Sequence, residues 1–240
     1  MAKAFFIDTT VCTGCRGCQV ACKQWHDLPA EETQNSGSYQ NPPDLSFETY
    51  KLVRMREEVI DNKLRWLFFP DQCRHCREAP CLDTAADPRA IFRDAASGAV
   101  IYTANTVDLI TAEIIESCPY NIPRNDSRGI LAKCDMCLDR VQNGLLPACV
   151  QTCPTGAMNF GDEQEVRQMA QQRLAAVQKS FPQAQLLDPD DVRVIYLTAF
   201  APENYHETAV AGVYRLGTSR RFAFRRLLGP LNRTISALGS

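Results

Sequence analysis

Four cysteines close to the start of the chain constrain this sequence more than any other feature. They are Cys12, Cys15, Cys18 and Cys22, with the spacing C-x2-C-x2-C-x3-C. A short loop with this spacing can point three sulfurs at one inorganic cube, while the fourth thiol falls on the helix that follows. The spacing is typical of bacterial ferredoxins, in which the fourth cysteine ligates a second iron–sulfur cluster. The run therefore predicts iron–sulfur ligation, with a zinc knuckle or a disulfide staple as the alternatives.

Composition weakens the disulfide alternative. The chain has 240 residues, is 45% hydrophobic and contains 12 cysteines. A chain of this size can build its own hydrophobic core, so it does not need the disulfides that stabilise short secreted domains. A net charge of −2 gives no reason to expect a nucleic-acid partner. No apolar run approaches the ~18 residues needed to cross a bilayer, and the first residues lack the pattern of a signal peptide.

The other eight cysteines form three further groups. One group has the spacing C-x2-C-x4-C, another is a single cysteine before a proline, and the last resembles a second ferredoxin run with an insertion. These groups are Cys73, Cys76 and Cys81; Cys118; and Cys134, Cys137, Cys149 and Cys153. The repetition favours clusters over isolated zinc sites.

The crossed ligation of two-cluster ferredoxins divides the twelve thiols into three sets. Set A is Cys12, Cys15, Cys18 and Cys153; set B is Cys22, Cys134, Cys137 and Cys149; set C is Cys73, Cys76, Cys81 and Cys118. A fourth set would need thiols at positions now held by Ala85, Asp108, Thr111 and Ile114. We therefore predict three [4Fe–4S] clusters and no fourth. We expect apolar and β-branched side chains to fill the place of the missing cluster.

Hydrophobic patterns predict an α+β fold. Strands are expected at 4–8, 99–102 and 191–197, a hairpin from 50–56 and 64–69, and helices at 108–117 and 162–181. The crossed sets predict two interleaved ferredoxin-like units. Residues 1–30 and 125–162 form the outer unit with two clusters, and residues 31–124 form the inner unit with one. Residues 163–240 form a helical or extended segment expected to dock on another subunit.

No other constellation indicates catalysis. His26 and His206 are isolated in the sequence, and His75 is expected beside a cluster or at the surface. Lys23 and Lys133 flank ligand cysteines, where their charge can influence a cluster, but a position in solvent is the simpler expectation. A Rieske site and a haem attachment motif both lack their required residues. The sequence thus favours electron conduction over chemistry.

Several segments resemble the iron–sulfur (beta) subunits of molybdenum or tungsten bis-pterin oxidoreductases. The resemblance covers most of residues 3–200 and is greatest to the small subunit of soluble, two-subunit formate dehydrogenases. The segments that carry it best are Cys134-Asp135-Met136-Cys137, Gly144 to Cys149, and Cys153 to Asp162. Residues 208–240 match the family least well.

The resemblance implies a catalytic large subunit that holds the metal–pterin cofactor and oxidises formate or reduces carbon dioxide. This chain would relay electrons between that subunit and a soluble partner such as a c-type cytochrome. It also implies a periplasmic location by export together with the large subunit, with the cytoplasm as the alternative. The equivalent subunit of a polysulfide, thiosulfate or sulfoxide reductase is a second candidate, because cluster ligation does not encode the substrate. A zinc-structured interaction protein is a third.

The end of the chain is basic and partly apolar. Beyond Glu207 it has no acid, and it contains Arg215, Arg220, Arg221, Arg225, Arg226 and Arg233. This mixture suits an interface with a large subunit, and a disordered basic tail is the alternative.

Overall fold

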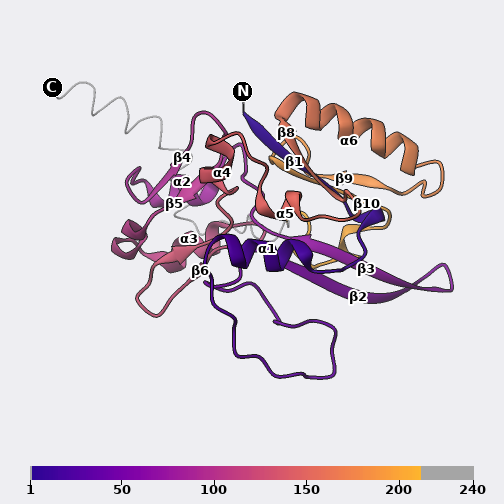
Figure 1. The fold of residues 1–240 in the computed structure, drawn as a ribbon, viewed down its shortest axis with the longest axis horizontal. Coiled ribbons are helices and arrows are strands. Elements are labelled where there is room, and N and C mark those ends of the chain that lie inside the picture. The colour runs from indigo at the N-terminus through magenta and orange to yellow at the C-terminus, as the bar shows by residue number, and fades with distance from the viewer. Residues whose placement is uncertain (1, 212–240) are drawn as a thin grey trace, which may run out of the picture.

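The computed structural model of the chain describes residues 2–211. It has the predicted α+β character, with a four-stranded sheet and three two-stranded sheets joined by short helices (Figure 1). The strands are β1 (Lys3–Asp8), β2 (Leu52–Ile60), β3 (Lys63–Asp71), β4 (Ile91–Arg93), β5 (Val100–Tyr102), β6 (Arg124–Asn125), β7 (Leu131–Ala132), β8 (Met158–Asp162), β9 (Gln185–Leu187) and β10 (Val194–Thr198). The helices are α1 (Gly17–Trp25), α2 (Pro80–Ala85), α3 (Thr111–Ser117), α4 (Leu138–Gln142), α5 (Ala148–Gln151) and α6 (Glu163–Val177).

The four-stranded sheet brings both ends of the described chain together. Its strand order is β8-β1-β10-β9, and β1 runs parallel to β10 with Phe5 opposite Val194. β8 is antiparallel to β1, and β9 is antiparallel to β10. Residues 163–198 therefore complete the sheet that β1 begins. The expectation that residues 163–240 dock on another subunit stays a prediction.

Both faces of this sheet are covered, as the alternation of side chains on each strand requires. Phe5 and Ile7 pack on one face with Val53 and Phe69 of the β2–β3 hairpin. Phe6 belongs to the opposite face and packs in a second apolar cluster with α6 residues, among them Val166, Ala170 and Val177. Figure 1 shows α6 lying along the sheet. The sheet is thus a rigid base for the cysteine loop that follows β1.

The inner part of the chain is built from small elements around its own apolar cluster. Helices α2 and α3 pack against each other, and β4 pairs with β5 in an antiparallel ladder. The buried members of this cluster, called the inner apolar cluster below, are Ala79, Ala90, Ile91, Val100, Ile114 and Leu131. Ala85 packs against them.

The structure agrees with most of the predicted elements and shifts some of their ends. The helix expected from position 108 begins at Thr111, because residues 104–108 form a 3-10 turn. The helix expected to reach position 181 ends at Val177. No helix in the described part of the chain is both long and apolar enough to span a membrane. The predicted interface segment lies largely outside the described residues.

Candidate functional site

Set A lines a pocket where the β1 loop meets the end of α5. Cys12, Cys15, Cys18 and Cys153 all border it, together with Val53 and Met158 among others. Asp8 at the end of β1 positions the loop, because its Oδ1 accepts a hydrogen bond from the Thr10 amide at 2.9 Å. The structure thus brings together the four thiols that the crossed rule assigned to one site, although Cys153 is far from the others in sequence.

Gly14 allows the set A loop to turn beneath the hairpin. Its φ is +65°, and a Cβ at this position would lie 2.7 Å from the Phe68 ring. A larger residue would be strained in this conformation and would also displace the ring. The glycine in the C-x2-C spacing is therefore required by the contact with β3.

Cys153 differs from most of its partners in its surroundings. Partial burial alone would raise its pKa, but the amide of Met158 and the amide and hydroxyl of Thr155 lower it. The Thr155 hydroxyl lies 3.8 Å from the Cys153 sulfur. Burial instead raises the pKa of Cys18 to about 11. Donors aimed at a sulfur favour the thiolate, which is the form that binds a metal.

Set B lies where α1 meets the last cysteine run, and all four of its cysteines are buried. The neighbouring charges of Cys22 and Cys149 add to burial in raising the pKa of Cys134 and Cys137. The packing agrees, because α1, which carries Cys22, lies against α5, which carries Cys149.

Two side chains at the end of α1 tie the two runs of set B together. His26 Nδ1 donates to the Cys22 carbonyl and Nε2 donates to Asp135 Oδ1, both at 2.9 Å. Trp25 Nε1 donates to Asp139 Oδ2 at 3.0 Å. Burial alone would lower the pKa of His26, but hydrogen bonds with Asp135 and Cys22 raise it to about 11. The expectation that His26 is isolated is wrong, because Asp135 follows Cys134 on the other run.

Set C lines a second pocket in the inner part of the chain. Cys73, Cys76, Cys81 and Cys118 border it, with Tyr102, Tyr120 and Lys133 among the other lining residues. Burial, with the charge of Cys81, raises the pKa of Cys118 to about 12. No cysteine of set C is exposed, whereas Cys15 of set A is exposed.

The residues beside set C correct two expectations. Lys133 is buried, and its amine donates to the carbonyls of Val100 at 2.5 Å and Cys134 at 3.0 Å. His75 is also buried, so its expected surface alternative is wrong. Its Nδ1 accepts from the Val100 amide at 3.1 Å, while burial and the charge of Lys133 lower its pKa. Lys23 is half-buried and donates to the carbonyls of Pro29 and Glu48.

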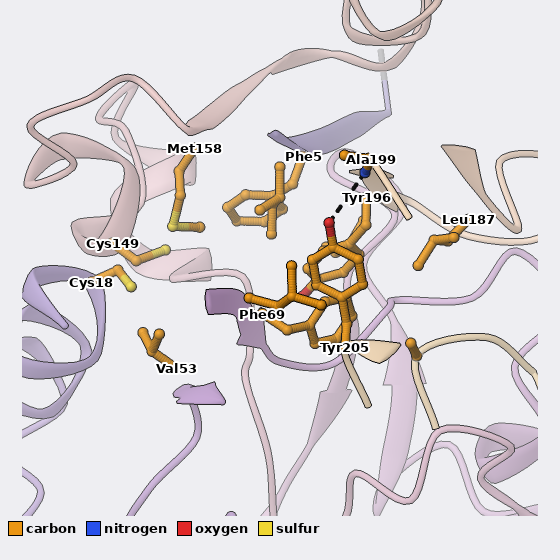
Figure 2. Packing of buried hydrophobic residues seen from close by; sticks show 14 of the residues in the cluster. Phe5, Cys18, Val53, Phe69, Cys149, Met158, Leu187, Tyr196, Ala199 and Tyr205 are labelled. Atoms are coloured by element: carbon orange, nitrogen blue, oxygen red, sulfur yellow. Dashed lines mark hydrogen bonds between the residues drawn. The ribbon is translucent and has the colours of Figure 1, made fainter. Parts of the chain in front are cut away.

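The three sets are neighbours. Cys18 of set A and Cys149 of set B pack in one apolar cluster, where Figure 2 shows them side by side. Cys134 of set B and Cys73 of set C pack in the second cluster. Set B therefore borders both other sets.

The donor chemistry fits iron–sulfur clusters. All twelve cysteines lie in the described part of the chain, and there none is joined in a disulfide. Within that part, the residues lining the two pockets include no carboxylate and no imidazole. Four sulfur donors suit a [4Fe–4S] cluster, and they also suit a zinc ion. Comparison with known proteins separates these two possibilities.

Residues 64–163 match the model of the 4Fe-4S dicluster domain family. The chain is 59% identical over 215 residues to the formate dehydrogenase subunit beta of Megalodesulfovibrio gigas, covering 88% of this chain and 100% of the relative. It is 51% identical over 216 residues to the formate dehydrogenase 2 subunit beta (cytochrome c-553) of Nitratidesulfovibrio vulgaris, covering 87% and 99%. The iron–sulfur subunit of the nitrate-inducible formate dehydrogenase of Escherichia coli is 38% identical over 210 residues, covering 85% and 71%. The chain belongs to the family of iron–sulfur (beta) subunits of formate dehydrogenases.

Proposed function

We propose that this chain relays electrons through three [4Fe–4S] clusters, between the metal–pterin large subunit of a formate dehydrogenase and a soluble redox partner. The observation that carries the proposal is the grouping of the twelve thiols into three neighbouring sets of four. Sets A, B and C would each hold one cluster. Bound clusters supply one-electron transfer, which divides the two electrons of formate oxidation into single steps.

The protein's own residues would hold these groups and shield them. Burial of Cys18, Cys22, Cys134 and Cys149 keeps water from these four sulfurs of sets A and B. The links from His26 to Asp135 and from Trp25 to Asp139 hold α1 against the last cysteine run. This arrangement would fix the relative positions of sets A and B, since Cys18 and Cys22 both lie on α1.

The partner proposal rests on the relatives. The relatives reported above are named as subunits of formate dehydrogenases, which supports a catalytic large subunit as the partner of this chain. The name of the Nitratidesulfovibrio vulgaris relative includes cytochrome c-553, which supports a c-type cytochrome as the soluble partner. A molybdenum or tungsten bis-pterin would then be bound in the large subunit alone. Export of the two subunits together to the periplasm is part of this proposal.

Purification of the native complex tests the proposal directly. We expect about 12 iron and about 12 sulfide per copy of this chain, in addition to any cluster of the large subunit. The complex should reduce a c-type cytochrome when formate is added. Stoichiometric zinc with negligible sulfide would contradict the presence of iron–sulfur clusters. A complex that does not oxidise formate would contradict formate as the substrate.

A further inference from the structure

Lys51 is a buried cation with no carboxylate partner. Its side chain lies just before β2, and the residue is 1% exposed. Its amine donates to Gln72 Oε1 at 2.5 Å and to the Pro70 carbonyl at 3.3 Å, and both acceptors are neutral. Within residues 2–211, no carboxylate oxygen lies within 4.0 Å of this amine. A buried charge without a counter-charge is destabilising, so its compensation has to come from elsewhere.

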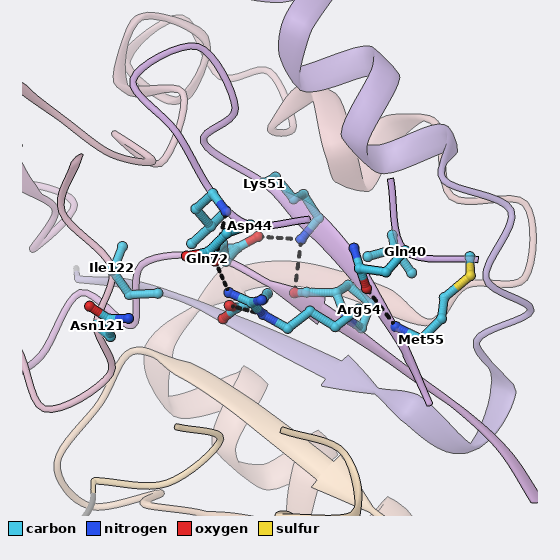
Figure 3. A network of polar contacts seen from close by, with 12 residues as sticks. Gln40, Asp44, Lys51, Arg54, Met55, Gln72, Asn121 and Ile122 are labelled. Atoms are coloured by element: carbon cyan, nitrogen blue, oxygen red, sulfur yellow. Dashed lines mark hydrogen bonds and ion pairs between the residues drawn. The ribbon is translucent and has the colours of Figure 1, made fainter. Parts of the chain in front are cut away.

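The buried acid nearest in sequence to the Lys51 acceptors is already paired. Asp71 lies between Pro70 and Gln72 and accepts from Arg54 Nε at 2.8 Å and from Arg74 Nη1 at 2.9 Å. Figure 3 shows the Lys51 amine bonded to Gln72 and the Arg54 guanidinium bonded separately to Asp44. The arginines therefore compensate the acids of this region, and Lys51 remains without a carboxylate.

The charges that do act on Lys51 come from two cysteine sets. Burial alone would lower its pKa, but the charges of Cys18 and Cys149 raise it. Cys18 belongs to set A, and Cys149 belongs to set B. Conversely, the charge of Lys51 counteracts the effect of burial on the pKa of both thiols. The geometry agrees, because Pro70, whose carbonyl accepts a hydrogen bond from the Lys51 amine, borders the set A pocket, and Cys149 of set B packs in the same apolar cluster as Cys18.

We propose that Lys51 is the shared counter-cation of the cluster sites formed by sets A and B, and that it raises the reduction potentials of both clusters. This inference rests on the proposed function, because it requires clusters at those sets. One added electron makes a cluster more negative, and a fixed positive charge nearby stabilises that state. The effect is large in a protein interior, where the dielectric constant is low.

Set C has a different cation. Lys133 borders the set C pocket, and its amine lies 4.6 Å from the centre of the Tyr102 ring. Its charge counteracts the burial of the Cys81 thiol. The charge of Lys51 therefore acts on sets A and B, and the charge of Lys133 acts on set C. Removal of Lys51 should leave the cluster at set C unchanged, and removal of Lys133 should leave the cluster at set A unchanged.

The test is a potentiometric titration of the complete complex, with dithionite as the reductant and EPR spectra as the readout. Signals are first assigned with one cysteine variant from each set. In Lys51→Met we expect the midpoint potentials of two clusters to shift to more negative values and the third to stay constant. Lys51→Arg keeps the charge, so its two potentials should remain close to those of the unchanged complex.

Lys23→Met is the matched control. Lys23 follows Cys22 directly, but its amine has a carboxylate partner, Glu31, at 3.8 Å. Loss of this compensated charge should shift the potentials much less than loss of Lys51. If Lys51→Met does not assemble, Lys51→Gln provides a polar neutral replacement with the same expected shift.

Three results would overturn the proposal. They are unchanged potentials in an intact Lys51→Met complex, an equal shift in Lys51→Arg, and loss of iron from both neutral variants. The last result would assign Lys51 a role in assembly instead. Iron and sulfide counts on the unchanged complex test the three-cluster proposal separately, so an absent shift counts against Lys51 alone.

Discussion

The outer and inner parts of the cysteine pattern differ in what lies beside their thiols. In the outer part, sets A and B meet directly at Cys18 and Cys149, with the charge of Lys51 acting on both. In the inner part, set C lies beside the inner apolar cluster, formed by α2, α3 and the β4–β5 ladder. A cysteine run can therefore have either a second thiol set or apolar side-chain packing beside it.

The inner apolar cluster and the side chains packed against it include two of the positions at which a fourth set would need thiols. Ile114 is 1% exposed in this cluster, and Ala85 packs against it. Both occupy positions where a fourth cluster would need thiols, and they are packed as expected. Asp108 is exposed and Thr111 is only half-buried, so these two do not fill an interior space. Ile114 and Ala85 therefore contribute to apolar packing, and a cavity left at a buried position such as Ile114 would reduce stability.

The largest expected effect is the loss of one whole cluster from the outer part. Cys22→Ser and Cys137→Ser should remove the same EPR signal, because both residues belong to set B although they lie on different runs. Iron should fall from about 12 to about 8 per chain in either variant. The crossed assignment is wrong if Cys22→Ser instead removes the signal that Cys12→Ser removes.

The next effect concerns packing in the inner part. Ile114→Ala should lower the free energy of unfolding by about 2 to 5 kcal/mol, because it leaves a cavity among buried side chains. Iron content should not change. Thermal unfolding with iron analysis measures both quantities, and Ile110→Ala is the control because Ile110 is 67% exposed. Loss of iron from Ile114→Ala alone would contradict a purely packing role.

A smaller effect is expected when one thiol is restored to the inner part. Ala85→Cys should leave the iron content at about 12 per chain, because a [4Fe–4S] cluster needs four ligands and three would still be absent. Ala85→Ser controls for the added volume. A rise toward 16 iron, by about four, would show that the inner part can still assemble a second cluster.

A further prediction concerns the pH dependence of stability near the hairpin. Burial and the charge of Arg54 lower the pKa of His206 to about 4. In the unfolded chain an ordinary histidine titrates near ~6.5, so the unfolded state binds a proton first as the pH falls. Stability should therefore decrease between about pH 6.5 and pH 4, and His206→Gln should weaken this dependence. Identical unfolding profiles of the two proteins over this range would refute the assignment.

Local patterns predicted half of the strands in the described part of the chain and did not predict the pairing of distant strands. Alternating apolar residues were enough to locate β1, the β2–β3 hairpin, β5 and β10. They could not show that β1 pairs with β10, because this contact joins Phe5 to Val194. β9 was missed because three residues carry too little periodicity to stand out. The pairing is set by packing against α6 and the hairpin, which no single window of sequence contains.

The thiols were easier to predict than the charges around them. Cysteine spacing follows from the geometry of a cubane, so local sequence carries the information. No spacing pattern identifies a buried lysine, so a position in solvent is the reasonable expectation for each lysine. That expectation was wrong for Lys133, and the burial of Lys51 was not predicted at all. The thiols whose charge can compensate a buried amine include cysteines that are distant from the lysine in sequence.

The exposure of Cys15 gives the molecule a defined point of chemical weakness. Cys15 is the one exposed cysteine of the twelve, whereas all of set B is buried. Oxidants and chelators in the solvent reach exposed sulfur first, and oxidation of a thiolate beyond the sulfenic acid is largely irreversible. We therefore expect damage in air to begin at set A and to reach the fully buried set B last.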